Sequence, residues 1–163
     1  FSVETTFNDD IVSVEQVLPI LLEQCDVVAT RMRRKEKKCT SVSVTFRTLD
    51  FRNKSHQTTL PNATDMTDEI YKNAKKLFIE SWKGEPLRLI GVALTNLTDE
   101  SFEQMSLFED NEQKERHRKL DATMDAIRQK FGNDKITRAS IMNSNTGIAR
   151  KARAQMKNED EKK

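Results

Sequence analysis

The stretch Val42-Ser43-Val44-Thr45-Phe46-Arg47 decides the fold, because its pattern is typical of one kind of element. Apolar Val42, Val44 and Phe46 alternate strictly with polar Ser43, Thr45 and Arg47. Such alternation predicts a β-strand with one face on a core and the other on solvent. A strand of this kind needs a sheet, and the polar face of that sheet is rich in hydroxyl groups.

Three further stretches on either side of this strand predict its partners in the sheet. They are residues 1–7, which alternate and are ended by Asn8-Asp9-Asp10; residues 55–60, which follow a turn at residues 50–54 and end at Pro61-Asn62; and the apolar residues 87–97. In the last of these, Ile90, Val92 and Leu94 share one side. The strand at residues 55–60 is polar on both faces, so it is the least strongly marked.

Two amphipathic helices are predicted between these strands. The first begins at a capping box of Ser13 and Gln16. Its apolar stripe consists of Val14, Val17, Leu18, Leu21, Cys25, Val28 and Met32. Pro19 lies inside it and lacks a backbone donor, which predicts a kink or a helix in two parts. The second helix starts at residues 65–67 and ends before Gly84, with Ile70, Ala74, Leu77 and Phe78 on one face.

The resulting order is strand, helix, strand, strand, helix, strand. This order predicts an α+β fold of the ferredoxin-like split kind, a four-stranded antiparallel sheet with both helices on one face. The other face of the sheet is then left open, and Ser43, Thr45, Arg47 and Thr58 are expected on it.

Nothing in the chain resembles a catalytic set or a metal site. There is no activated nucleophile, no carboxylate cluster and no acidic pair placed to hold two metal ions, and four glycines nearly exclude a nucleotide-binding loop. Cys25 is expected on a helix stripe and Cys39 in a basic loop, with no Cys-x-x-Cys spacing, while His56 and His117 are expected as surface residues. The sequence therefore predicts no cofactor on this chain and no enzyme activity of its own.

The charge is unevenly distributed although the net charge is only +2. Residues 31–54 hold nine basic and two acidic residues, and residues 135–157 hold six basic and none acidic. Both runs fit either ordinary solvated surface or a footprint for a polyanion. No apolar run approaches about 18 residues, and no signal peptide is visible, so we expect a soluble, cytoplasmic protein with no membrane partner.

After the last strand comes the segment Gln104-Met105-Ser106-Leu107-Phe108, flanked by acidic residues. Its spacing matches the peptide by which bacterial proteins bind the replicative sliding clamp: Gln, then Leu or Met, a small polar residue and Leu-Phe. The alternative is that Leu107 and Phe108 pack back onto the domain.

The rest of the chain predicts an appendage. Residues 112–131 read as a third helix with the stripe Leu120, Met124, Ile127 and Phe131. This helix could pack on the domain, pair with another chain, or stay marginal until bound. We therefore divide the chain into a domain (1–98), a linker with the peptide (99–110), a helical extension (111–142) and a disordered polar tail (143–163).

Several of these motifs together resemble a known family. They are Glu4-Thr5-Thr6-Phe7, Leu18-Pro19-Ile20-Leu21-Leu22, residues 42–47, Thr59-Leu60-Pro61, Thr67-Asp68-Glu69-Ile70-Tyr71 and Leu87-Arg88-Leu89-Ile90-Gly91-Val92. They are similar to the C-terminal little-finger domain of Y-family translesion DNA polymerases, the ImpB/MucB/SamB group that includes DNA polymerase IV. The likeness covers about residues 1–108, and residues 119–139 resemble the tail of Gram-positive members. Ser2 stands where the family usually has glycine, and Met105 where leucine is commoner.

The resemblance implies a domain that lays its sheet along duplex template-primer DNA without reading its sequence. The implied DNA-binding residues are Ser43, Thr45, Arg47, Arg52, Lys54 and Thr58, and the implied clamp-binding residues are Gln104, Met105, Ser106, Leu107 and Phe108. The other implied partner is the catalytic part of the same polymerase, which holds the Mg²⁺-binding carboxylates that this chain lacks.

Two other functions stay open at this point. An RNA-recognition sheet would stack bases on exposed aromatic rings, so the positions of Phe46 and Phe51 are decisive. A protein-interaction domain with a clamp-binding tail fits the near balance of fourteen basic and fifteen acidic residues in residues 1–100.

Overall fold

The computed structural model describes residues 1–99 and 111–142. The elements in chain order are β1 (Ser2–Ile11), α1 (Val14–Arg33), β2 (Lys38–Thr48), β3 (Asn53–Thr64), α2 (Thr67–Ser81), β4 (Leu87–Thr98), α3 (Asn111–Phe131) and the 3₁₀ helix η1 (Ala139–Ile141). The candidate clamp peptide, residues 104–108, and the predicted tail, residues 143–163, lie outside the described residues.

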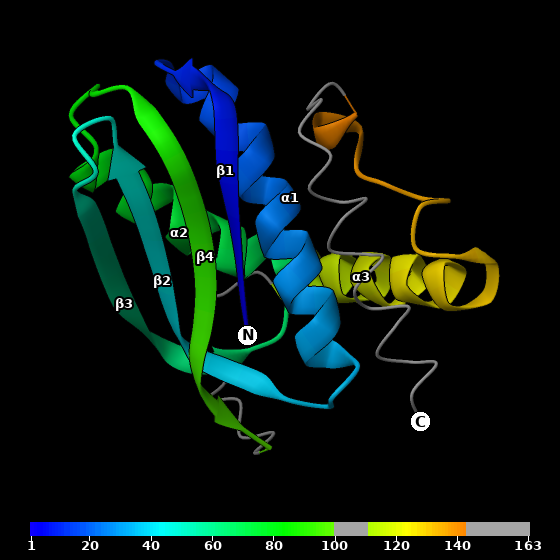
Figure 1. The fold of residues 1–163 in the computed structure, drawn as a ribbon. Helices are drawn as coiled ribbons and strands as arrows, with labels where there is room; N and C mark the ends of the chain where they lie inside the picture. The colour runs from blue at the N-terminus through cyan, green and yellow to red at the C-terminus, as the bar shows by residue number, and fades with distance from the viewer. Residues whose placement is uncertain (100–110, 143–163) are drawn as a thin grey trace.

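The four strands form one antiparallel sheet in the order β1-β4-β2-β3, with α1 and α2 side by side on one face (Figure 1). The predicted α+β fold is therefore confirmed. Each helical crossover passes over one strand, as the split arrangement requires. The central pair consists of β4 and β2, whereas the central pair of a ferredoxin-like sheet consists of its first and third strands.

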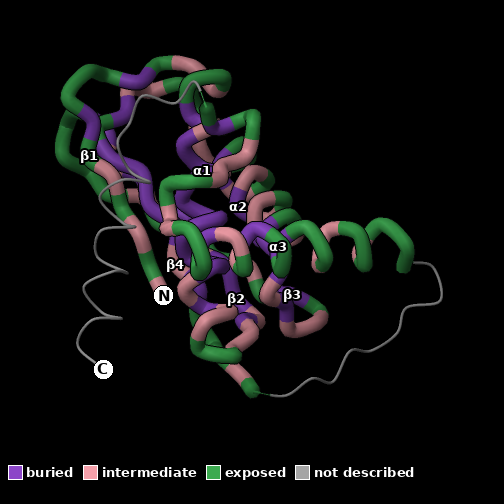
Figure 2. The backbone as a smooth tube through the Cα atoms, turned by 90° about the vertical axis from the view of Figure 1, so that its right-hand side faces the viewer, coloured by how far each residue is buried: buried purple, intermediate pink, exposed green. Residues whose placement is uncertain are grey.

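The hydrophobic core lies between the sheet and the two helices (Figure 2). Val42, Val44 and Phe46 of β2 are fully buried in it, as their alternation predicts. Phe46 meets Phe78 of α2 edge to face with ring centroids 5.9 Å apart, and Phe78 stacks on Trp82 at 5.2 Å. Burying rings of this size is the main source of stability in a sheet with helices on one face.

Two strands are longer than the sequence indicates. β1 continues through Asn8-Asp9-Asp10 to Ile11, and its register to β4 shifts between Thr6 and Ile11. β3 begins at Asn53 and runs past Pro61 to Thr64, again with a register shift. Both strands are sheet edges, where a bulge or a proline leaves no central ladder hydrogen bond unmade.

Helix α1 begins with the predicted capping box of Ser13 and Gln16. It runs unbroken to Arg33, so the predicted division into two parts is wrong. Pro19 lies in the second turn, where its ring removes a single helical hydrogen bond. The buried stripe that follows it holds the remaining turns against the sheet.

Cys39 was expected in a loop, but it lies in β2 and is fully buried. The basic residues that precede it end α1 and begin β2, so the loop between the two elements is short. Cys25 lies on the buried stripe of α1, as predicted.

Helix α3 forms where it was predicted, but the face it buries is different. Its buried residues are Asp121, Met124 and Arg128, whereas Leu120 is 45% and Phe131 59% exposed. Of the predicted stripe, only Met124 is buried and Ile127 is half-buried, because the charged residues of α3 have buried partners on α1. Of the three possibilities for this helix, the structure shows packing on the domain.

Within residues 1–99 and 111–142, no helix combines the length and apolar composition needed to cross a membrane.

Candidate functional site

The face of the sheet opposite α1 and α2 is covered by no helix among the described elements (Figure 1). Side chains of directly paired strand residues share a face, so the register defines this open face. Ser43 pairs with Ala93, Thr45 with Gly91 and Arg47 with Leu89. The open face thus consists of Ser2, Glu4 and Thr6 of β1, Leu89, Gly91, Ala93 and Thr95 of β4, Ser41, Ser43, Thr45 and Arg47 of β2, and Asn53, Ser55, Gln57 and Thr59 of β3.

Hydrogen bonds between β2 and β3 order the polar groups of the open face. The Thr45 hydroxyl donates to Ser55 Oγ at 3.1 Å, and Gln57 Nε2 donates to Ser41 Oγ at 3.1 Å. Arg47 Nε donates to Asn53 Oδ1 at 2.6 Å, which leaves the terminal nitrogens of its guanidinium as further donors. The result is a flat array of hydroxyls and amides with one cation at one end.

Glu4 of the edge strand β1 brings a carboxylate to the open face, and its side chain lies beside Gly91 of β4. A Cβ atom at Gly91, its cross-strand neighbour, would lie only 2.6 Å from Glu4 Cγ. Position 91 therefore has to be glycine for the Glu4 side chain to lie across the sheet as it does. The negative charge of Glu4 offsets part of the attraction that Arg47 gives this face for an anion.

The structure places the six predicted DNA-binding residues in three different settings. Ser43, Thr45 and Arg47 lie on the open face. Thr58 was expected there too, but it pairs with Val42, whose side chain is in the core, so it lies on the helix-covered side. Arg52 lies in the turn between β2 and β3, exposed and 3.0 Å from Asp50.

Lys54 also lies on the helix side, because it pairs with Phe46. Its ammonium lies over the Phe46 ring and 2.6 Å from Glu85 Oε1. The hydrogen bond from Lys54 lowers the pKa of Glu85 below its usual value. Lys54 is thus already paired with an acid. The sequence did not single out the residues of β3 that do reach the open face, which are Asn53, Ser55, Gln57 and Thr59.

The basic run of residues 31–54 does not form one cationic surface. Arg33 is 2.6 Å from Asp125 on α3, and Lys37 pairs with Asp99. Together with the pairs of Arg52 and Lys54, these contacts give four of the nine basic residues an acidic partner. The electrostatic footprint that the run indicated is reduced accordingly in the folded chain.

No aromatic side chain belongs to the open face that the described strands form. Phe46 faces the core, and Phe51, which is 80% exposed, lies in the turn beyond the strand ends with a positive φ of 59°. An RNA-recognition sheet that stacks bases on its rings is therefore not supported. Among residues 1–99 and 111–142, no group of His, Cys, Asp and Glu side chains is placed to hold a metal ion.

Comparison with known sequences gives one family. The model of the impB/mucB/samB family C-terminal domain matches residues 1–107. A DNA polymerase IV of Clostridium acetobutylicum is 43% identical over 139 residues, which are 85% of this chain and 35% of the relative. A DNA polymerase IV of Alkaliphilus oremlandii is 36% identical over 147 residues, with 85% and 37% covered. The chain thus spans about a third of the length of these relatives.

Solved structures show the same fold at low sequence identity. One is described as "Complex of beta-clamp processivity factor and little finger domain of PolIV", with a TM-score of 0.50, 20% identity, and 66% of this chain and 97% of that chain covered. Another, "Post-insertion binary complex of Dbh DNA polymerase", gives a TM-score of 0.54 at 20% identity, over 61% of this chain and 29% of that chain. Fold and sequence agree, and the chain belongs to the impB/mucB/samB family of C-terminal domains.

Proposed function

We propose that this chain is the little-finger domain of a DNA polymerase IV-type translesion polymerase and that its open face lies along template-primer duplex DNA. The family and the relatives named DNA polymerase IV support this assignment. Nucleotide transfer, with its Mg²⁺ ions, then belongs to catalytic domains of the parent protein against which this domain lies, and the whole enzyme acts on damaged DNA in the cytoplasm.

The observation that carries the proposal is the chemistry of the open face. Ser43, Thr45 and Ser55 present hydroxyls, of which Ser55 keeps a free donor because Ser43 donates to the Ala93 carbonyl and Thr45 to Ser55 Oγ. Arg47 adds a guanidinium, and the described strands bring no aromatic ring to this face. Groups of this kind bind phosphate oxygens and fix the position of a duplex without reading its bases. A polymerase that meets damaged templates needs contacts of this type.

The open face carries one cation, Arg47, among its described residues, which predicts weak binding with little dependence on salt. The isolated domain should bind duplex DNA at the weak end of the non-specific range, ~10⁻⁴ M, and the slope of log K against log salt concentration should correspond to about one neutralised phosphate. Fluorescence anisotropy on two duplexes of unrelated sequence, over a series of salt concentrations, measures both quantities. Arg47→Ala should remove most of the slope, while Lys76→Ala, on an exposed part of α2, serves as the control.

Glu4 provides a second test on the same surface. Its carboxylate lies where phosphates would approach, so Glu4→Gln should tighten duplex binding, by roughly twofold to fivefold if the repulsion is about 0.5 to 1 kcal/mol. Glu15→Gln, an exposed acid of α1, is the matched control. A preference for one base sequence, or binding that Arg47→Ala and Glu4→Gln leave unchanged, would count against the open face as the DNA site.

We also propose that residues 104–108 bind a bacterial sliding clamp, with Leu107 and Phe108 as buried anchors and Gln104 fixing the register. Burying each anchor contributes about 1.5–3 kcal/mol, whereas a micromolar complex totals about 8 kcal/mol. Leu107→Ala with Phe108→Ala should therefore abolish most clamp binding in calorimetry and leave the melting temperature unchanged. Retained binding with a lower melting temperature would mean that the two residues pack on the domain itself.

The second candidate function is a protein-interaction domain with a clamp-binding tail. The carboxylate of Glu4 on the open face and the acidic partners of four residues of the basic run favour it, because both reduce attraction to a polyanion. Clamp binding without any duplex binding at low salt would select this candidate over the first.

A further inference from the structure

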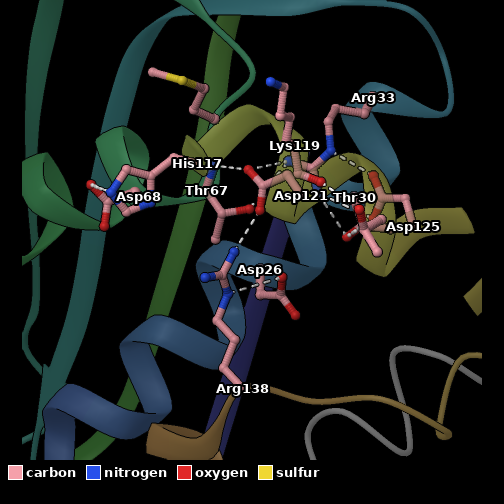
Figure 3. Close-up of polar contacts among 12 residues, drawn as sticks. Asp26, Thr30, Arg33, Thr67, Asp68, His117, Lys119, Asp121, Asp125 and Arg138 are labelled. Atoms are coloured by element: carbon pink, nitrogen blue, oxygen red, sulfur yellow. Dashed lines mark hydrogen bonds and ion pairs between the residues drawn. The ribbon is translucent and has the colours of Figure 1, made fainter. Parts of the chain in front are cut away.

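Helix α3 and η1 are attached to the helical layer chiefly by charged side chains (Figure 3). Arg128 Nη2 lies 2.6 Å from Asp26 Oδ2, Arg33 Nε 2.6 Å from Asp125 Oδ2, and Arg138 Nη2 2.5 Å from Asp121 Oδ1. Thr30 of α1 accepts from Arg128 Nη1 and donates to Asp125. The first two pairs join α1 to the segment of residues 111–141, which we call the strap. The third lies within the strap, and Arg138 Nε is also 3.6 Å from Asp26 Oδ1 of α1.

The apolar contribution to this attachment is small. Met124 and Ile141 are the buried apolar side chains of the strap, and the core cluster of sheet, α1 and α2 includes neither of them. Leu120 and Phe131 point outward. The core is therefore complete without the strap, and the strap depends on ion pairs whose inner members, Asp26 and Arg128, are only 2% and 3% exposed.

The strap also completes helix α2. The N-cap of α2 is Met66, which offers no side-chain acceptor for the free amides of the first turn. Asp121 of α3 supplies the missing acceptor, because its Oδ2 accepts a hydrogen bond from the Thr67 backbone N–H at 2.9 Å. Arg33 joins the same point, since its Nη1 donates to the Asp65 carbonyl at 2.7 Å and lies 3.3 Å from Asp121 Oδ2. One carboxylate therefore links α1, α2 and α3.

We infer that ion pairs hold the strap closed over α1 and the start of α2, and that the strap opens without unfolding the sheet. A buried ion pair adds little net stability because its desolvation cost offsets the attraction, whereas removing one partner leaves a buried charge uncompensated. A segment with few buried apolar contacts belongs to the least stable part of a fold. Together these properties make Asp121 the positioning residue on which the closed state depends.

Hydrogen exchange measured by NMR on the full chain tests this inference. Asp121→Ala removes the cap and the charge, so the amides of α3 and the Thr67 amide should exchange at least tenfold faster. Amides at the centre of β2 and β4 should keep their wild-type rates. Asp121→Asn keeps an acceptor for Thr67 but loses the charge that faces Arg33 and Arg138, so it should speed exchange in α3 more than at Thr67.

Glu112→Gln, an exposed acid near the start of α3, is the control and should change none of these rates beyond its own turn. The inference is overturned if Asp121→Ala leaves the Thr67 amide and α3 at their wild-type rates. It is equally overturned if both Asp121 variants raise exchange uniformly through β2 and β4, because the strap and the sheet would then open as one unit.

Discussion

Two phenylalanines five residues apart differ completely in environment. Phe46 is enclosed by Phe78 and the sheet, whereas Phe51 lies in an exposed turn with a left-handed backbone conformation that costs about 1–2 kcal/mol for a residue with a side chain. Phe46→Ala should lower the free energy of unfolding by about 3–5 kcal/mol, as expected for a large buried ring. Phe51→Ala should stay within about 0.5 kcal/mol of wild type. Urea unfolding of both variants measures the difference, and equal losses would contradict the placement of Phe46.

The cysteines are predicted to be inert in the folded chain. Burial raises the pKa of the Cys39 thiol from its ordinary value of 9.0 to about 12, and burial raises the pKa of Cys25 as well. At pH 8 the thiolate fraction of Cys39 is then on the order of 10⁻⁴, and the thiolate is the reactive form.

A thiol reagent at pH 8 should therefore modify neither cysteine until denaturant is added. The sign of the pH effect on stability follows from the same shift: the folded state keeps the Cys39 proton to a higher pH than the unfolded chain. Stability from this group is complete below pH 9 and falls as pH rises from about 9 to about 12. Rapid modification of the folded chain at pH 8 would show that these side chains are accessible.

At the scale of elements, the start of α1 gives the clearest local prediction. The Ser13 hydroxyl accepts from the Gln16 backbone N–H, and the Gln16 side chain accepts from the Ser13 backbone N–H. Ser13→Ala should cost about 1 kcal/mol, the usual value for a lost N-cap. Lys72→Ala, an exposed change in α2, is the control in the same thermal melts. A Ser13 variant as stable as this control would mean that packing alone fixes the start of α1.

The same elements show what the sequence can and cannot predict. β2 is predictable because its two faces differ in polarity throughout residues 42–47, and this contrast fixes which side chains face the core. β3 is polar on both faces, so nothing in its own sequence sets the register, and a shift of one residue exchanges the faces. That is why Thr58 was expected on the wrong side of the sheet, while Ser43, Thr45 and Arg47 lie on the expected side. Lys54 was expected in the turn and instead lies within β3, on the helix-covered side.

Helix α3 shows a second limit. Periodicity located the helix, but an apolar stripe indicates the buried face only when apolar contacts decide the packing. Here Asp121 and Arg128 are buried because they pair with Arg33 and Asp26 of α1. These partners lie 88 and 102 positions away in the sequence. No local pattern reports such a pairing.

At the scale of the whole molecule, ion pairs join the domain of residues 1–98 to the strap, although the predicted boundary at residue 98 separates them. A chain ending at residue 98 should still fold, because the core cluster includes no residue of the strap. It loses the cap that Asp121 gives to α2, which is worth about 0.5–2 kcal/mol. Urea unfolding followed by circular dichroism should show a cooperative transition at lower urea than that of the full chain. A chain of 98 residues without such a transition would show that the strap is required for folding.

The ends of the connection between β4 and α3 have a consequence for any partner that recognises residues 104–108. Thr98 lies in the sheet, and Asn111 begins α3, which ion pairs hold against α1 while the strap is closed, so residues 99–110 are joined at both ends to the folded domain. These twelve residues reach at most about 40 Å when fully extended. A peptide joined to the domain at both ends cannot enter a closed pocket end first. If residues 104–108 bind the clamp as we propose while the strap is closed, the receptor should be a groove open at both ends, which the peptide enters sideways.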